Sequence, residues 1–215
     1  MKTLLALLII TARPSAAYRI ENAAAPAGAP AIYVQVLADA RPETEITGAQ
    51  AGFNNRATKD SMFADSVTTA VTWALADELK VHGLDARVLG PGEIPPVGST
   101  VLTGEIRSYT SRMITPRTAM IPYVSWVTWL WSKDKIAGEV EVRVNLSRPG
   151  QAMWQETFKA SEDTQAWVGP LHLSERGRSI TRREMVIMLH EAAKNVLGRA
   201  AGRTADALGV PPRNR

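Results

Sequence analysis

The stretch GEVEVRVNL, residues 138–146, constrains the fold more than any other part of this chain. Charged and polar residues alternate there with four apolar ones, Val140, Val142, Val144 and Leu146. A period of two is typical of a strand in a sheet with one covered face and one wet face. After a turn at residues 148–151, the stretch AMWQETFKASE carries Trp154 and Phe158 on one face. The sequence therefore predicts an antiparallel hairpin.

Three further segments have strand character. Residues 32–39 alternate apolar and polar side chains, and Pro42 disfavours their continuation. Residues 101–113 form a second strand of good length, and residues 86–90 a shorter one. Residues 43–60 are polar and rich in glycine, which predicts a loop.

Two segments have helical character. Residues 61–84 have an apolar face at helical spacing; Ser61 or Asp65 can cap the start, and Gly83 suits a left-handed cap at the end. Residues 181–184, Thr-Arg-Arg-Glu, match a capping box that opens a helix running to about residue 208. Residues 161–180 are predicted to be irregular. The expected fold class is α+β, a small, mostly antiparallel sheet with two helices on one face.

The N-terminus is predicted to be an export signal. Met1 and Lys2 are followed by an apolar run at residues 4–10, too short to span a bilayer. Small residues at 15–17 suit cleavage before Tyr18. We therefore expect a signal peptide at 1–17, an Ala/Pro-rich linker at 18–30, one domain at 31–209 and a disordered tail at 210–215, in a periplasmic protein.

Charge and cysteine content narrow the classes of partner. The net charge is +4, and the excess lies in residues 172–215, which contain 9 basic and 4 acidic side chains. This predicts a solvated basic helix face, or a surface for anionic lipid or an acidic partner; export argues against nucleic acid. The chain has no cysteine, which excludes disulfides, thiolate metal sites and a lipid anchor on cysteine.

The most unusual segment is MIPYVSWVTWLWSKDK, residues 120–135, which holds three of the six tryptophans. As a helix it would carry Ser125, Thr128 and Ser132 on a narrow face; the opposite side would carry Tyr123, Trp126, Val127, Leu130 and Trp131. Cations flank it on both sides. The residues predicted to make contact are Ile121, Tyr123, Trp126, Val127, Trp129, Leu130 and Trp131, with Arg117, Lys133 and Lys135.

Three interpretations of this Trp-rich segment stay open. Its rings can pack into the protein's own core, although three tryptophans would over-fill a small one. They can anchor a partner protein or a second copy of this chain, because Trp and Tyr are typical interface anchors. They can also lie at a membrane surface, where aromatic residues beside cations are favoured.

Few residues suggest chemistry. His82, His172 and His190 have no metal-ligand spacing, and no nucleotide-binding or hydrolase motif is present. Asp39 and Arg41 are predicted to form a structural ion pair at the end of a strand. We therefore expect no cofactor, no metal and no catalytic site.

Several of these features together resemble the YajG-like bacterial envelope lipoproteins. They are the export signal, a strand ending in Asp39-Ala40-Arg41, a helix ending in glycine, a hairpin with Trp154 on its second strand, and a C-terminal helix, over residues 31–208. The lipidated cysteine is absent, and the Trp-rich insertion has no counterpart in that pattern. The resemblance implies a non-enzymatic envelope protein that binds or scaffolds.

The sequence thus predicts an exported binding or assembly module. Its partner is an envelope protein complex or a membrane surface, and self-association stays open. The alternative is a periplasmic carrier of a small apolar ligand or lipid, with the aromatic rings lining a pocket between sheet and helix.

Overall fold

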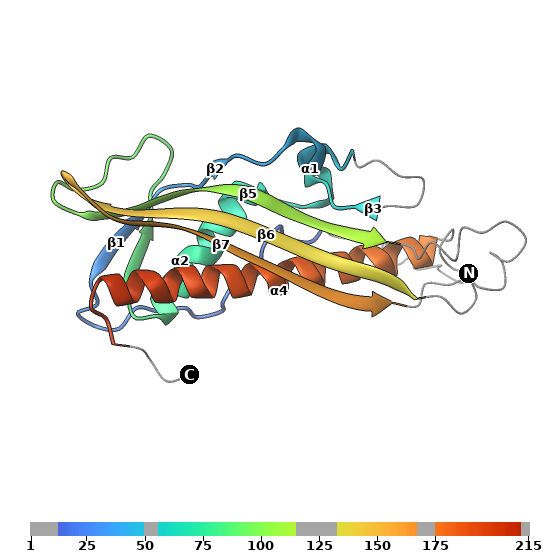
Figure 1. Cartoon of the computed structure of the whole chain (residues 1–215). Helices are drawn as coiled ribbons and strands as arrows, with labels where there is room; N and C mark the ends of the chain where they lie inside the picture. The colour runs from blue at the N-terminus through green and yellow to red at the C-terminus, as the bar shows by residue number, and fades with distance from the viewer. Residues whose placement is uncertain (1–12, 50–55, 115–132, 167–174, 212–215) are drawn as a thin grey trace, which may run out of the picture.

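The computed structural model describes residues 13–49, 56–114, 133–166 and 175–211. They form an α+β fold with helices against one face of a sheet (Figure 1). The order of the main strands is β4-β1-β5-β6-β7, and two short strands, β2 and β3, pair with β5. Their bounds are Ala31–Val34 for β1, Ala38–Asp39 for β2, Arg56–Ala57 for β3, Asp85–Val88 for β4, Thr100–Ile114 for β5, Asp134–Arg148 for β6 and Gln151–Ala166 for β7.

The sheet is mixed: its long strands pair antiparallel as expected, and the parallel pairs around β1 and β2 were not predicted. Strand β1 runs parallel to both of its neighbours, β4 and β5, and β2 is also parallel to β5. The pairs β3–β5, β5–β6 and β6–β7 are antiparallel. Parallel neighbours need a crossover connection. Helix α2 (Val67–Val81) supplies it between β1 and β4.

The predicted hairpin is confirmed as β6 and β7. Their register pairs Val142 with Phe158 and Leu146 with Trp154, and Gly150 has the positive φ of 76° that the turn needs. The alternating apolar side chains of β6 are fully buried. Each such residue contributes about 1.5–3 kcal/mol through burial. The opposite face of the hairpin is polar, with Lys159 bridging to Glu139.

Helix α4 (Glu175–Ala207) is longer than predicted and begins six residues before Thr181. The predicted irregular region 161–180 is likewise wrong at both ends, because β7 continues to Ala166. Thr181 is buried inside the helix, so tertiary packing outweighs its local capping signal. A helix of this length and a hairpin strand of 15 or 16 residues both measure about 50 Å. Helix α4 therefore runs the whole length of the hairpin (Figure 1).

Gly138 lets helix α4 approach the sheet closely. A Cβ atom at this position of β6 would lie 2.5 Å from the backbone carbon and oxygen of Met188 and 2.7 Å from the nitrogen of Leu189. Such distances are well inside van der Waals contact. The absence of a side chain therefore sets the spacing between α4 and β6.

Residues 43–60, predicted to be a loop, contain further short elements. Helix α1 (Glu43–Thr47) ends at Gly48, which has a φ of 71°. A 3₁₀ turn, η1, spans Asp60–Met62. Glu45 of α1 is buried and accepts hydrogen bonds from the Ser108 hydroxyl and the Tyr109 amide, both at 3.1 Å. This tertiary contact, which a local pattern does not show, holds α1 against β5.

Candidate attachment surface

Strands β5 and β6 bring both ends of the Trp-rich connection to one end of the sheet. Ile114, the last residue of β5, pairs with Lys135, the second residue of β6. We call this end, where Ile114 and Asp134 lie, the Trp-side end. Ile114 is 46% exposed, and Lys133 and Lys135 are exposed as well. The ammonium of Lys135 lies 2.6 Å from a carboxylate oxygen of Asp163 on β7.

Most of the predicted contact residues lie outside the residues that the structure describes. These are Arg117, Ile121, Tyr123, Trp126, Val127, Trp129, Leu130 and Trp131. Their contact with a membrane or partner stays a prediction. Lys133 and Lys135 are within the described part, at the point where the chain re-enters the sheet.

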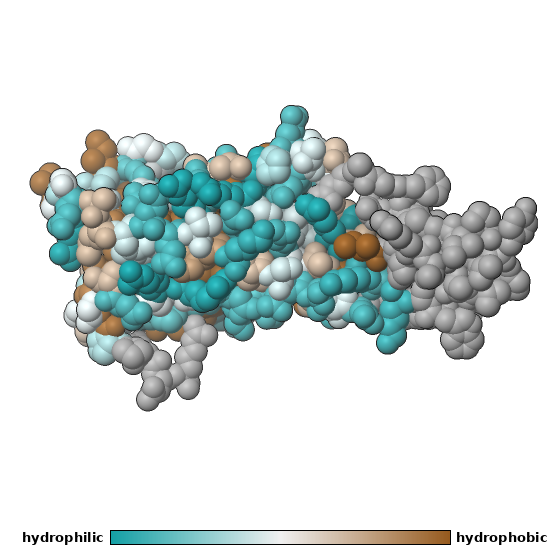
Figure 2. Space-filling model, viewed as in Figure 1, coloured by the Kyte–Doolittle hydropathy of each residue, from teal (hydrophilic) through white to brown (hydrophobic). Residues whose placement is uncertain are grey.

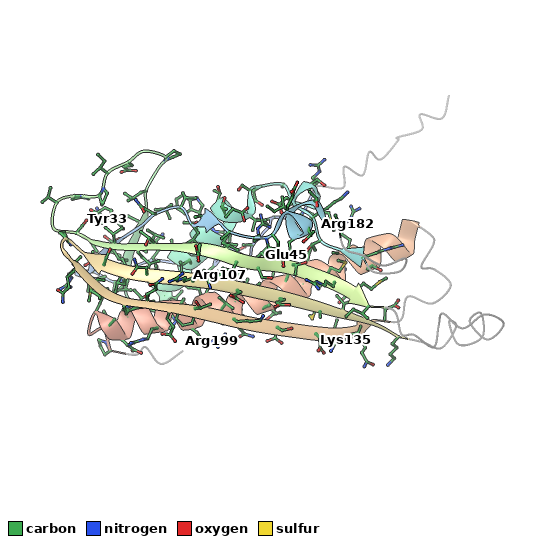
Figure 3. All side chains as sticks on the ribbon, turned by 45° about the horizontal axis from the view of Figure 1, so that its top comes forward. Tyr33, Glu45, Arg107, Lys135, Arg182 and Arg199 are labelled. Atoms are coloured by element: carbon green, nitrogen blue, oxygen red, sulfur yellow. The ribbon has the colours of Figure 1, made fainter. Side chains whose placement is uncertain are left out.

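A groove with cations on its rim lies at the same end of the molecule. Its volume is about 450 Å³. Figure 3 labels Arg182 of α4 and Lys135 of β6 toward this end, whereas Arg107 lies halfway along the sheet. We call this groove the cationic groove. It is lined by Thr47, Gly48, Arg56, Ala57, Lys59, Met62, Thr181, Arg182 and Met185.

The cationic groove combines positive charge with apolar side chains. Arg56, Lys59 and Arg182 contribute the charge, and Met62 and Met185 contribute apolar surface. Met185 belongs to a small buried cluster with Met113 and Ile136, the second core of the described residues. Methionine side chains adapt to irregular surfaces. A groove of this kind suits an anionic group that carries an apolar part.

Arg41 fixes one wall of the cationic groove. Its guanidinium, only 1% exposed, donates to both carboxylate oxygens of Asp39, at 2.9 and 2.7 Å, and to both of Asp60, at 2.9 and 2.8 Å. Asp39 is the partner of Arg41 that the sequence predicted, and Asp60 is a second partner. These hydrogen bonds from Arg41 lower the pKa of Asp39 despite its partial burial. The fork joins the end of β2 to Asp60, the first residue of η1, which ends at the groove residue Met62.

Strand β3 is fixed to β5 next to the groove. The Thr58 amide donates to the Ser111 carbonyl, and the Ser111 amide donates to the Thr58 hydroxyl, each at 2.9 Å. Thr58 and Ser111 are both buried. Reciprocal hydrogen bonds of this kind orient the neighbouring side chains of Ala57 and Lys59. The groove therefore stands on a fixed backbone.

Within the described residues, no group of three or more His, Asp or Glu side chains is placed to hold a metal ion. His82 follows α2 and His190 lies on α4, while His172 is outside the described residues. None of the described helices has the length and apolar character needed to cross a bilayer. Figure 2 shows that this face of the described surface is mostly hydrophilic.

The cationic groove was not predicted from the sequence. Its residues come from two regions about 120 positions apart, and both were interpreted as irregular or as a helix start. The only local signal is the group of basic residues around Arg56 and Lys59. Such a group is equally typical of a solvated loop.

The comparisons with known proteins give similarity of fold alone. No protein-family model matches this chain, and no curated protein does. Among solved structures, the DUF330 protein XCC0632 from Xanthomonas campestris is 10% identical, with a TM-score of 0.49, over 93% of this chain and 94% of its own.

Two further solved structures are similar at lower scores. A PelC dodecamer from Paraburkholderia phytofirmans is 13% identical, with a TM-score of 0.37, over 83% of this chain and 90% of its own. A minor lipoprotein from Acinetobacter baumannii is 13% identical, with a TM-score of 0.37, over 88% of this chain and 100% of its own. At such identities and scores the similarity carries no argument about function. The resemblance to the YajG-like lipoproteins stays a prediction.

Proposed function

We propose that this chain is an exported, non-enzymatic envelope protein that acts as a binding or assembly module. In this proposal its Trp-side end attaches to an anionic membrane surface. The observation that carries the proposal is the position of the cationic groove. The groove and the exposed Lys133 lie at the end of the sheet where both flanks of the Trp-rich connection meet. Aromatic residues beside cations are favoured at the interface between water and lipid.

The binding free energies expected of the cations and of the tryptophan rings differ, so the two groups have different roles. A cation next to an anionic leaflet contributes about 1 kcal/mol. Arg56, Lys59, Lys133 and Arg182 together would then give about 4 kcal/mol, which corresponds to a dissociation constant of about 1 mM. Each indole that is buried adds on the order of 4 kcal/mol. Stable attachment therefore requires the tryptophans, and the cations select the type of surface.

The test is flotation of the protein with lipid vesicles. One set of vesicles contains one-third phosphatidylglycerol, and the other contains phosphatidylcholine alone. The wild type should float with the anionic vesicles, and less so in 0.5 M salt, since screening weakens the charge contribution. Trp126→Ser combined with Trp129→Ser and Trp131→Ser should abolish flotation.

A matched pair of charge variants locates the contact. Lys59→Glu with Arg182→Glu changes the charge at the cationic groove, and should reduce flotation at least tenfold. Arg148→Glu with Lys194→Glu makes the same change in net charge away from it, and should leave flotation unchanged. Equal loss in both variants, or a wild type that does not float, would contradict membrane attachment. A pull-down from envelope extract and light scattering would then test a protein partner or self-association.

The alternative of an apolar carrier has less support. The space between the sheet and the helices is filled by core side chains, among them Val142, Leu189 and Val196, which are fully buried. A carrier would need its cavity elsewhere. A binding module uses the surface and is compatible with a filled core.

A further inference from the structure

Residues 14–19 are built into the fold as a strap. We call them the N-terminal strap. Ala16 is 0% exposed and Ala17 is 1% exposed, and both belong to the main core with residues of α2, α4 and the sheet. Tyr18 packs against the same core. The signal-peptide pattern assigns residues 14–17 of the strap to the removed segment, and Tyr18 and Arg19 to the start of the mature chain.

Hydrogen bonds fix the first half of the strap. The carboxylate of Asp65, just before α2, accepts from the Ser15 hydroxyl at 2.7 Å and from the Ala16 amide at 2.6 Å. The buried Tyr109 hydroxyl donates to the Ala16 carbonyl. A ring nitrogen of His190 on α4 lies 3.2 Å from the Ser15 carbonyl. The strap thus bridges β5, α4 and the start of α2.

Two acidic residues of α2 fix the second half. Glu78, 1% exposed, accepts from the Tyr18 hydroxyl at 3.0 Å. Asp77, 3% exposed, accepts from the Arg19 guanidinium at 2.7 Å. A buried carboxylate is costly without a hydrogen-bonding partner. The interior of the protein is therefore arranged around these strap residues.

Cleavage between Ala17 and Tyr18 would remove half of this arrangement. It would take away two buried alanines, both partners of Asp65 and the acceptor of the Tyr109 hydroxyl. A buried polar group left without a partner destabilises the folded state. A new charged N-terminus at Tyr18 would also lie beside the core. A chain cut at this bond would lose a part of its native structure.

We propose that the mature protein retains residues 14–17, so that removal of the export signal takes place N-terminal to Pro14. The apolar run ends at Ile10, and Ala12 supplies the small residue that a signal peptidase needs before the cut. The expected N-terminus is thus Arg13. This boundary differs from the one that the small residues at 15–17 predict.

The direct test is the N-terminus of the processed protein. The full chain is expressed in a bacterial host, recovered from the envelope fraction, and examined by N-terminal sequencing and intact mass. An N-terminus at or before Arg13 supports the proposal. An N-terminus at Tyr18 overturns it. The result does not depend on membrane attachment, so it is separate from the flotation experiment.

A second test asks whether the strap is docked onto the core. In the full chain, Asp65→Ala removes two hydrogen bonds to the strap and should lower Tm by roughly 6 °C. It should also speed trypsin cleavage after Arg19 at least tenfold. Asp85→Ala is the matched control, because Asp85 bonds to the exposed Arg87 on edge strand β4 and makes no contact with the strap among the described interactions. Equal, small effects of both variants would overturn the docking.

Discussion

Gly138→Ala tests whether the close approach of α4 to β6 is required. The added methyl group would meet backbone atoms of Met188 at 2.5 Å, about 1 Å inside ordinary contact. Backbone atoms of a long helix cannot rotate away as a flexible side chain would. Helix α4 must therefore move away from the hairpin that it covers. The apolar contacts on both sides of Gly138 would then loosen.

The expected cost is about 3 kcal/mol, the upper part of the range for overpacking a core. For a domain of this size, that corresponds to a fall in Tm of roughly 9 °C. Gly198→Ala, in the interior of α4, is the matched control. Its new methyl group would lie 3.8 Å from the nearest atom, an oxygen of Glu78, which is an ordinary contact. Alanine favours the helix over glycine, so we expect a gain of up to about 1 kcal/mol.

Circular dichroism at 222 nm, in thermal and urea unfolding of both variants, measures these differences. The two substitutions make the same chemical change, so opposite signs isolate the effect of helix–sheet spacing. A Gly138→Ala variant as stable as the wild type would show that α4 does not hold this distance, and the packing argument would be refuted.

Arg41→Ala should lower the free energy of unfolding by about 2 kcal/mol in urea titration; the loss is moderate because the side chains of Asp39 and Asp60 are 32% and 36% exposed and can rehydrate. Because hydrogen bonds from Arg41 lower the pKa of Asp39, the contribution of this pair is complete above about pH 4 and is lost as the pH falls through the folded-state pKa. Asp39→Asn should therefore weaken the dependence of the free energy of unfolding on pH below pH 4, measured by denaturant unfolding. An unchanged slope would count against this role of Asp39. Burial lowers the pKa of His190, although Asp65 and Glu191 act in the opposite direction. The unfolded chain then takes up the proton first, so Tm should fall as the pH drops below about 6.5 in the wild type and stay level in His190→Gln; parallel curves would contradict this.

Local patterns predicted the hairpin and the turn that joins its strands. The alternation from Val140 to Leu146 leaves one arrangement of β6 that buries every apolar side chain. Gly83 adopts the positive φ expected of a cap residue, and Gly150 has a positive φ in the predicted turn. In each case the structure depends on residues that are close together in the chain, so a local pattern is enough to predict it.

Contacts between residues far apart in the chain could not be predicted from local patterns. The sequence suggested Asp65 as a helix cap. Its carboxylate instead accepts hydrogen bonds from Ser15 and Ala16, which lie 50 and 49 positions earlier in the chain. Arg41 was paired with its neighbour Asp39, while its second partner, Asp60, comes from a segment interpreted as a loop. The parallel pairing of β1 likewise depends on where a crossover returns, which no local period specifies. The residues of the cationic groove likewise come together through long-range contacts, among them the Arg41–Asp60 hydrogen bonds and the pairing of β3 with β5.

The equal length of α4 and the β6–β7 hairpin gives the molecule an elongated shape (Figure 1). The exposed side chains of Ile94 and Val97 lie in the connection between β4 and β5, at the end opposite the Trp-side end (Figure 1). The two ends are separated by about 50 Å, well beyond the roughly 30 Å of a bilayer's hydrocarbon core. A protein held at one end would present the other at a fixed height, where it can engage a neighbour that never touches the membrane.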